Sequence, residues 1–386
     1  MSENRTPSGG GRRKRKNDLP VEVPEAQREL SRRRFLKYAG ASAVAIPAYA
    51  GMVDVLTAEP ASAATYKANA HIAAFAHHPK YHFVMDCHVT TNSFFTATVY
   101  GIQDACALAG CSYQWTGSTN SIVGQMVSAM NSAIASKANG IGVCLIDNTA
   151  FNNPVASALS HGIPVIAFNA DVSAGVKNNR MAYVGQNNLT AGAAVAKEIL
   201  KLGIGKGDLV AGIIATPGTG NIQPRLDGAK PVLKKAGVHL QEVGTSATEG
   251  APEYNKISAW YAGNKDVKFM MAVDSGDSNA VAQFIQKEHL KGKVKASVWD
   301  VGLPVTQAIH AGYITTTVDQ QAYLQGFDTI MQLFLWNVSG GLMVPTDTDT
   351  GLGIVTKSNV GPYLNKNRFE GTSAGAKTLK APGKIA

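Results

Sequence analysis

The chain has 386 residues, of which 45% are hydrophobic and 16% charged, and its formal net charge is +9. Residues 1–37 hold 11 of the 36 Lys and Arg residues and 5 of the 27 Asp and Glu residues, so the charge of the remainder is nearly balanced. A balanced chain lacks the basic face that DNA or RNA binding requires, and we expect no nucleic-acid partner.

The first 65 residues predict a leader that is not part of the fold. Residues 1–29 are polar and basic without an apolar period, which is typical of disorder. The run Ser31-Arg32-Arg33-Arg34-Phe35-Leu36-Lys37 precedes an apolar stretch of small residues, and Ala61-Ser62-Ala63 supplies a cleavage site. These features resemble a twin-arginine export signal, so we expect an extracytoplasmic protein in the periplasm or cell envelope. A nuclear or nucleic-acid-binding basic patch would not be followed by such an apolar stretch and cleavage site.

From Tyr66 to Leu364, apolar strands alternate with amphipathic helices, which predicts an α/β fold with parallel sheets covered on both faces. This length suffices for two domains. The first series of expected strands is His82–Val89, Ser112–Thr116, Gly142–Ile146, Val165–Phe168 and Met181–Val184. The helices between them are expected at Phe94–Ala109, Ile122–Ser136, Pro154–Ser160 and Thr190–Leu202.

A short turn, residues 90–95, follows the first expected strand. Asn92 or Ser93 is placed to cap the next helix, whose apolar residues recur at steps of about 3.6. The turn therefore lies at the carboxyl end of a strand, where open α/β sheets bind ligands. Phe94 and Phe95 are adjacent, so only one of them can face the core of the helix. We expect Phe95 to stack on a ligand, although it belongs to the apolar stripe, and Phe94 is the alternative.

A second series of elements repeats the design of the first. Its expected strands are Leu209–Ala215, His239–Thr245, Phe269–Val273, Ala296–Trp299 and Thr315–Val318. Its expected helices lie near Gln223–Lys235, Ala251–Ala262, Ser278–Glu288 and Pro304–Ala311. Asp147 and Asn169 follow two strands of the first series, and Asp274 and Asp300 follow two strands of the second. One such residue could simply cap the next helix. Four in equivalent places predict two lobes that face each other across a ligand cleft.

The residues expected in this cleft suit a neutral ligand rich in hydroxyl groups. Carboxylates and amides accept hydrogen bonds from hydroxyls, Arg donates them, and aromatic faces pack on the C–H surface of a sugar. The predicted ligand-binding residues are Asn92, Phe94, Phe95, Asn169, Arg225, Tyr254, Asp274, Asp300 and Gln320. His88 and Asp171 are further candidates, and a buried structural role is an equal alternative for His88.

Four cysteines, Cys87, Cys106, Cys111 and Cys144, occur without a C-x-x-C pair, so neither a zinc site nor thioredoxin-like chemistry is indicated. Cys106 and Cys111 are close enough in sequence to pair, whereas the other two fall in expected core strands. The favoured interpretation is four small buried side chains, with the first pair open to a disulfide. We expect no metal and no cofactor.

On these residues, the mature region resembles a substrate-binding protein of the ribose-type ABC sugar importers, the type I periplasmic-binding fold. The resemblance rests on Asn92-Ser93-Phe94-Phe95, on Gly218-Thr219 with Arg225 and Gly228, and on the segment from Val318 to Gly326. It implies that Asn92 and Arg225 contact the sugar, that Phe94, Phe95 and Tyr254 form aromatic walls, and that Asp274, Asp300 and Gln320 contact its hydroxyls.

The chain departs from this family at the end of the fourth strand. Members that bind ring sugars commonly have Asp-Arg there, and this chain has Asn169-Ala170, followed by Asp171. A clamp on ring hydroxyls is therefore missing, which favours a smaller or open-chain polyol over a standard aldopentose or aldohexose.

The resemblance also implies the domain organisation and the partners. We expect a leader at 1–65, an N-terminal lobe of 66–185 plus 321–345, a C-terminal lobe of 186–320 plus 346–370, and a disordered tail at 371–386. Hinge crossings are expected near Val184–Asn187, Val318–Gln321 and Met343–Thr348. The protein should be a monomer that binds ligand without chemistry and delivers it to ABC permease subunits in the membrane.

Three alternatives share this architecture. An exported carbohydrate-active enzyme would need a nucleophile elbow or a metal motif. The one G-x-S-x-G run, Gly371-Thr372-Ser373-Ala374-Gly375, falls in the expected disordered tail and not between a strand and a helix, and H-E-x-x-H does not occur. A sugar-responsive repressor would need an N-terminal helix-turn-helix in place of the leader. A sensor that presents sugar to a membrane receptor kinase would use the same cleft, so the sequence leaves transport and sensing open.

Overall fold

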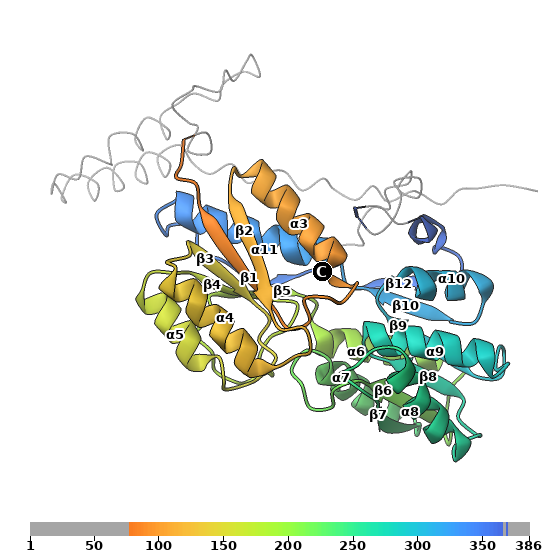
Figure 1. Cartoon of the computed structure of the whole chain (residues 1–386). Coiled ribbons are helices and arrows are strands. Elements are labelled where there is room, and N and C mark those ends of the chain that lie inside the picture. Colours follow the sequence, from red (N-terminus) through yellow and green to blue (C-terminus); the bar gives the residue numbers. More distant parts are fainter. Residues whose placement is uncertain (1–76, 366–367, 370–386) are drawn as a thin grey trace, which may run out of the picture. The chain divides into compact units, whose positions relative to one another are not determined.

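The computed structural model describes residues 77–365 and 368–369 (Figure 1). The predicted leader, 1–65, and the predicted tail, 371–386, lie outside these residues. The described part has two lobes within one structural unit, and each lobe is built on its own sheet. The predicted α/β architecture with two parallel-sheet lobes is confirmed.

The sheet of the first lobe has six parallel strands in the order β11-β5-β4-β3-β1-β2. Its strands are β1 (His82–Cys87), β2 (Ser112–Gly117), β3 (Gly140–Val143), β4 (Val165–Phe168), β5 (Ala182–Gly185) and β11 (Thr348–Asp349). Its helices are α3 (Phe95–Leu108), α4 (Val123–Ala135), α5 (Asn152–Ser160) and α11 (Ala322–Val338). Helix α3 packs against α11, and α4 packs against α5, so that helices cover both faces of the sheet (Figure 1).

The sheet of the second lobe has the order β12-β10-β9-β8-β6-β7, and only β12 runs antiparallel to its neighbour. Its strands are β6 (Leu209–Ile214), β7 (His239–Gly244), β8 (Phe269–Ala272), β9 (Lys295–Trp299), β10 (Thr316–Asp319) and β12 (Gly353–Thr356). Its helices are α6 (Asn188–Lys201), α7 (Gln223–Lys235), α8 (Ala251–Ala262), α9 (Ser275–Lys287), α10 (Leu303–Ala311) and the 3₁₀ helix η3 (Gly361–Leu364).

The central strands are apolar along their whole length because both faces of each sheet are covered. Every residue of β3, β4 and β8 is buried. In the second lobe, two separate apolar clusters lie on the two sides of the sheet, one beneath α6 and α7 and the other beneath α8, α9 and α10. Continuous apolar runs of this kind are what parallel strands in α/β proteins require.

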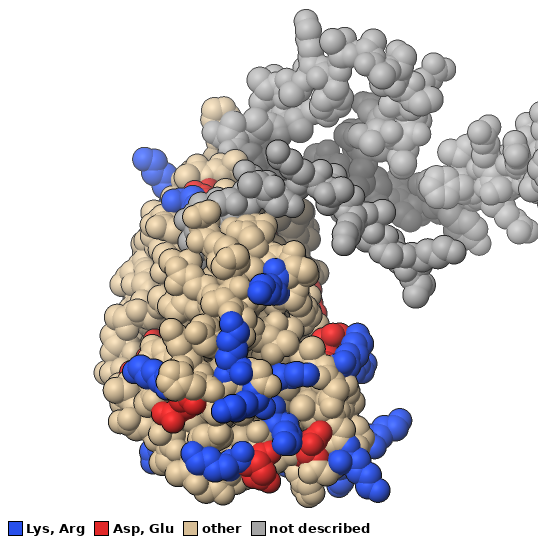
Figure 2. Space-filling model, turned by 90° about the vertical axis from the view of Figure 1, so that its right-hand side faces the viewer, with Lys and Arg blue, Asp and Glu red and all other residues tan. Residues whose placement is uncertain are grey.

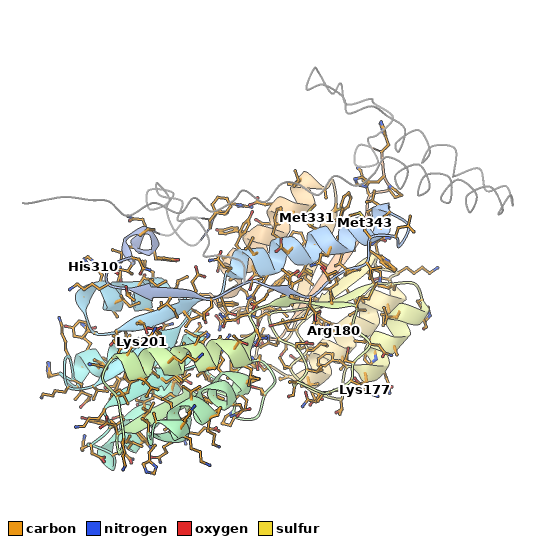
Figure 3. The ribbon with its side chains drawn as sticks, turned by 180° about the vertical axis from the view of Figure 1, so that it is seen from behind. Lys177, Arg180, Lys201, His310, Met331 and Met343 are labelled. Atoms are coloured by element: carbon orange, nitrogen blue, oxygen red, sulfur yellow. The ribbon has the colours of Figure 1, made fainter. Side chains whose placement is uncertain are left out.

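The chain crosses between the lobes three times. It crosses after β5 at residues 186–187, after β10 at residues 320–321, and between β11 and β12 at residues 350–352. The expected third crossing, Met343–Thr348, was therefore placed too early, because Thr348 and Asp349 still pair with β5 in the first sheet. Figure 3 shows the lobes from behind, with Met331 and Arg180 in the first lobe and Lys201 and His310 in the second.

Candidate functional site

The carboxyl ends of strands from both sheets meet around a cavity of about 60 Å³. Eight of the nine predicted ligand-binding residues line it, and His88 lines it as well. The lining residues are His88, Asn92, Phe94, Phe95, Asn169, Asn221, Ile222, Arg225, Asp274, Ser275, Asp300 and Gln320. Asn221, Ile222 and Ser275 are the members that the sequence did not point to.

Two larger cavities adjoin this one. A cavity of about 560 Å³ shares Phe94, Ser275 and Asp300 with it, and a cavity of about 240 Å³ shares His88 and Asp274, among others. The space between the lobes therefore continues beyond the small cavity into both larger ones.

Phe94 and Phe95 both line the cavity, but they lie in different surroundings. Phe95 begins α3, is buried, and packs edge-on against His88 with 5.4 Å between ring centroids. Phe94 is half-buried, lies edge-to-face on Phe95 at 4.9 Å, and also lines the 560 Å³ cavity. The ring of Phe94 is thus the more accessible of the two, and Phe95, which is buried in the core, packs behind it.

Asn92 joins the two lobes. Its side-chain oxygen accepts from the Phe94 backbone N–H at 2.8 Å and closes the turn before α3. The N-cap position of α3 is Phe94, so the expectation that Asn92 or Ser93 caps this helix is wrong. Its amide nitrogen donates to the Glu249 carboxylate, and the Ser275 hydroxyl lies 3.5 Å from its oxygen. Glu249 and Ser275 belong to the second lobe, so the turn at residues 90–95 lies at the lobe interface.

The position of Arg225 is set by a close helix crossing. A Cβ atom on Gly192 of α6 would lie 1.9 Å from the Arg225 carbonyl oxygen, and one on Gly228 of α7 would lie 2.0 Å from the Leu189 carbonyl oxygen. Only glycine permits this approach, which brings the backbone of α7 onto α6. The Arg225 side chain therefore starts from a tightly fixed backbone.

Arg225 is 3% exposed and lies on the indole face of Trp299, at 5.1 Å from the ring centroid. Its Nε donates to Asn188 at 2.9 Å, its Nη1 to the Val273 carbonyl at 2.6 Å, and its Nη2 to Gln320 at 3.3 Å. Burial lowers the pKa of the guanidinium, while the nearby Asp300 carboxyl raises it. The group remains a buried cation at the wall of the cavity.

Asp300 and Gln320 form the acceptor side of the same network. The Gln320 amide donates to Asp300 Oδ1 at 2.6 Å, and the Gln320 oxygen accepts from Arg225. Burial raises the pKa of Asp300 to about 6, although Arg225 and the Gln320 hydrogen bond both lower it. Asp300 also lines the cavity.

Asn169 and Asp300 have a strained backbone at equivalent positions. Each directly follows a central strand, β4 or β9, and their φ angles are 61° and 70°. Positive φ is uncommon for residues other than glycine, although Asn and Asp tolerate it best. Strain of this kind concentrates at functional sites, and here it turns both side chains out of the strand direction.

Side-chain amides tie the hinge crossings together. The Asn169 amide donates to Gln325 at 3.0 Å, and Gln325 donates to the Gln320 carbonyl at 3.1 Å. The Thr350 hydroxyl donates to the same carbonyl at 2.8 Å. At the first crossing, Gln186 accepts from the Trp299 indole N–H at 3.0 Å and donates to the third crossing. A contact at Gln320 is thus made to a hinge residue directly, and a contact at Asn169 reaches that residue through Gln325.

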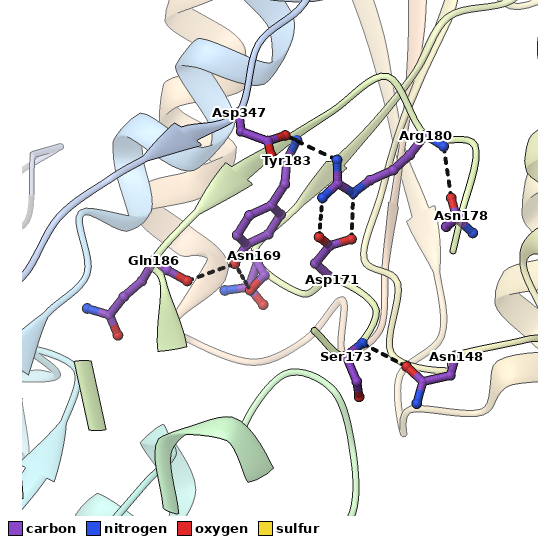
Figure 4. Close-up of polar contacts among 9 residues, drawn as sticks. All are labelled: Asn148, Asn169, Asp171, Ser173, Asn178, Arg180, Tyr183, Gln186 and Asp347. Atoms are coloured by element: carbon purple, nitrogen blue, oxygen red, sulfur yellow. Dashed lines mark hydrogen bonds and ion pairs between the residues drawn. The ribbon is translucent and has the colours of Figure 1, made fainter. Parts of the chain in front are cut away.

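Asp171 lies outside the cavity. Both of its carboxylate oxygens accept from Arg180, whose Nη1 also contacts Asp347 at 3.1 Å (Figure 4). The Tyr183 hydroxyl, beside this group, donates to the Asn169 carbonyl at 2.9 Å. The carboxylate of Asp171 is therefore used in a structural ion pair, and a ligand contact at this residue is not supported.

Tyr254 of α8 lines none of the three cavities and packs against the core of the second lobe. Its ring packs edge-on against Phe284 at 5.9 Å, and its hydroxyl lies 3.4 Å from Glu288. Helix geometry turns consecutive residues to different sides, and it is the preceding residue, Glu253, that faces the 240 Å³ cavity. The structure therefore does not support the predicted aromatic wall at Tyr254.

The two aspartates that follow β3 and β8 serve mainly as caps. Asp274 caps α9 by accepting from the Asp277 N–H at 3.0 Å, and its other oxygen accepts from the Ala215 N–H at 3.1 Å. Asp274 still lines the cavity. Asp147 accepts from the N–H groups of Thr149 and Ala150, which lowers its pKa, and it lines none of the three cavities. Of the four strand-end residues, three reach the site.

His88 and Asn221 meet across the lobes. The His88 Nε2 lies 3.4 Å from the amide nitrogen of Asn221, which belongs to the second lobe. The preceding Gly220 lies so close to the first lobe that a Cβ there would be 2.6 Å from the Asp171 carbonyl oxygen. The Gly218-Thr219 pair on which the family resemblance rests lies in this loop, but nothing in the sequence singles out Asn221.

On the face shown in Figure 2, Lys and Arg side chains lie among Asp and Glu side chains. Among the described residues, no helix is both long enough and apolar enough to cross a membrane.

Comparison with known proteins matches residues 83–335 to the periplasmic binding protein domain family. The xylose/arabinose-binding protein XylF of Sulfolobus acidocaldarius is 41% identical over 313 residues, which cover 78% of this chain and 77% of that protein.

Solved structures show the same fold. A solute-binding protein of an ABC transporter from Burkholderia graminis, in complex with D-arabinose, superposes with a TM-score of 0.68 at 24% identity, covering 75% of this chain and all of that one. The glucose-galactose binding protein GanP from Geobacillus stearothermophilus gives a TM-score of 0.67 at 21% identity, covering 73% and 99%. Two parallel-sheet lobes with a cavity between their strand ends, together with the matched domain, show that this chain belongs to the periplasmic binding protein family.

Proposed function

We propose that this protein is the extracytoplasmic sugar-binding component of an ABC importer and that it binds a small neutral sugar between its two lobes. The observation that carries the proposal is the buried network of Arg225, Gln320 and Asp300 beside Phe94. It offers a fixed cation, a carboxylate acceptor and an aromatic face, which is the combination that a polyhydroxylated ligand requires. The 41% identical relative is named for binding xylose and arabinose, and pentoses are therefore the first ligands to test.

The ligand would stabilise the closed arrangement of the lobes. Asn92 reaches Glu249 and Ser275 across the interface, and His88 reaches Asn221. A ligand that touches residues of both lobes gains contacts that exist only when the lobes are together, and it shifts the equilibrium toward that state by this difference. Domain closure of this type needs only a few hinge residues, which we place at 186–187, 320–321 and 350–352. The closed form would then be the one that docks on the permease.

A sugar alcohol is the second candidate ligand, and one observation favours it. In place of an Asp-Arg pair after β4, the chain has Asn169-Ala170, and the nearby Asp171 is held by Arg180. An open-chain polyol has no ring, so its binding does not require a charged pair that holds ring hydroxyls. The two candidates differ only in the ligand and share the cavity.

A thermal-shift screen of the purified protein tests the proposal. D-Xylose, L-arabinose, D-ribose, xylitol and arabitol are added one at a time. A ligand at 100 times its Kd raises the free energy of unfolding by about 2.7 kcal/mol, and for a chain of this size this corresponds to a rise in Tm of several degrees. No shift with any neutral polyhydroxylated compound would contradict the proposal. A shift with the alcohols but not with the pentoses would favour the second candidate.

We also propose that residues 31–37 direct export through the twin-arginine route. The support is the motif itself, because this segment lies outside the described residues. Replacing both Arg32 and Arg33 by Lys should retain the protein in the cytoplasm, and Arg34→Lys, at the variable position of the motif, is the matched control. Cell fractionation with an antibody against the protein measures the outcome, and unchanged export of the double variant would point to another route.

A further inference from the structure

Two cysteines and a histidine gather at the base of the cleft. Cys87 ends β1, His88 follows it, and Cys144 comes directly after β3. Asp86 pairs with Val143 in the parallel register of these strands, so Cys87 and Cys144 occupy the next rung and project from the same face. One ligand atom from each of the three residues lies within 4.8 Å of the other two.

The surroundings of this cluster leave polar atoms without partners. Both cysteines are free thiols with no solvent exposure, and His88 is 8% exposed. The imidazole Nδ1 is buried without a hydrogen-bond partner, and so is the side-chain oxygen of Asn221. Buried polar atoms in proteins are nearly always satisfied, so two neighbouring exceptions require an explanation.

A metal ion at the cluster accounts for the unpartnered Nδ1 of His88. Rotating the Asn221 amide by 180° exchanges its nitrogen and oxygen, and the oxygen then faces His88 Nε2. The imidazole can donate its Nε2–H to that oxygen, which leaves the lone pair of Nδ1 free for a metal. A histidine ligand whose second ring nitrogen donates to a carbonyl is the usual arrangement around protein-bound metals.

We propose that Cys87, His88 and Cys144 bind a thiophilic metal ion, Zn²⁺ or Cu⁺, with Asn221 orienting the imidazole. Two thiolates and one imidazole form a soft donor set that suits these ions and disfavours Mg²⁺ or Ca²⁺. Bonds of about 2.3 Å to sulfur and about 2.0 Å to nitrogen would need only a small contraction of the cluster. His88 also lines the cavity, so the ion would lie at the floor of the cleft. The two cysteines are 57 residues apart in sequence, which is why no spacing motif reveals the site.

Metal titration of the purified, reduced protein against a chromophoric chelator tests the proposal, with Zn²⁺ in one arm and Cu⁺ under nitrogen in the other. We expect one ion per chain. Cys87→Ser and Cys144→Ser should each weaken binding at least tenfold, and Asn221→Ala should weaken it 10- to 100-fold. Cys106→Ser is the matched control, because Cys106 is also a buried, free thiol but lies outside the cluster, and its affinity should be unchanged.

X-ray absorption of the metal-loaded wild-type protein gives a readout that does not depend on the folding of any variant. Two sulfur neighbours and at least one nitrogen neighbour are expected. Absence of stoichiometric binding, binding that survives Cys144→Ser, or a metal without sulfur neighbours would each overturn the proposal. A Cys87–Cys144 disulfide in the protein as isolated from its native compartment, found by thiol counting and peptide mapping, would overturn it in favour of a redox pair.

Discussion

Arg225 is the residue whose removal should damage the ligand site most. In Arg225→Ala, the Asn188 side chain, the Val273 carbonyl and Gln320 all lose a buried donor, and Asp300 loses its nearest cation. Removing one member of a buried charged network costs about 3–5 kcal/mol. We therefore expect a clear loss of stability in the protein without ligand.

The effect of this substitution on binding can be estimated separately. A hydrogen bond from a charged group contributes about 1.5–3 kcal/mol, which corresponds to a loss of affinity of roughly 10- to 150-fold. Arg225→Lys keeps the charge but not the planar fork, so it should fold better than Arg225→Ala and still bind at least several-fold more weakly than wild type.

Calorimetric titration with D-xylose and L-arabinose measures the loss, and thermal melting separates it from unfolding. Arg180→Ala is the matched control, because Arg180 also forms a partly buried ion pair but lines none of the three cavities. It should lower the melting temperature and leave the affinity within about twofold. Wild-type affinity in a folded Arg225→Ala protein would refute the proposed role of the network.

Three further predictions concern pH and packing. Because the pKa of Asp300 is about 6, sugar affinity should fall as the pH is lowered from 7 to 5, and Asp300→Asn should bind weakly at both pH values, without that dependence. Asp86 is fully buried, neither carboxylate oxygen has a partner, and burial raises its pKa from 3.8 to about 9. The folded protein keeps this proton where the unfolded chain loses it, so stability should decline from about pH 4 to pH 9, and Asp86→Asn should flatten the decline in melting curves. Gly192→Ala should lower the free energy of unfolding by at least about 1–3 kcal/mol, because the added Cβ would meet the Arg225 carbonyl oxygen. Gly124→Ala is the control: this position on α4 has open space around it, so the change should be neutral or stabilising. Denaturant titrations measure both.

The architecture was predictable because it depends on patterns that are local in sequence. Apolar runs and helical periods define the alternating elements, and polar residues directly after strands mark the sheet edge where ligands bind. Asn169, Asp274 and Asp300 were found in this way. The exception is β11, which has only two residues, so no apolar or alternating pattern predicts it. The third crossing is misplaced for this reason, because β11 still pairs with β5 in the first sheet.

The errors in the site have a different cause. Tyr254 was assigned by resemblance, but whether a helical residue faces the cleft depends on the rotation of α8 against the sheet, and here Glu253 faces it. The carboxylate of Asp171 pairs with Arg180 and not with a ligand, and this pairing depends on the conformation of the loop between them. Glu249 and Asn221 belong to loops of the second lobe and act on the first, so their roles depend on how two separately folded lobes meet, which no local pattern encodes.

The central claim is that a small neutral sugar or sugar alcohol binds between the lobes, against Arg225, Asp300 and the turn that carries Asn92 and Phe94. Calorimetric titration of the purified protein with D-xylose, L-arabinose and xylitol tests this claim most directly. Saturable binding of one molecule per chain, weakened at least tenfold by Arg225→Ala or Asp300→Asn and unchanged by Arg180→Ala, is the predicted result. Binding that ignores the Arg225 and Asp300 substitutions, or no binding of any of the three compounds, would contradict it.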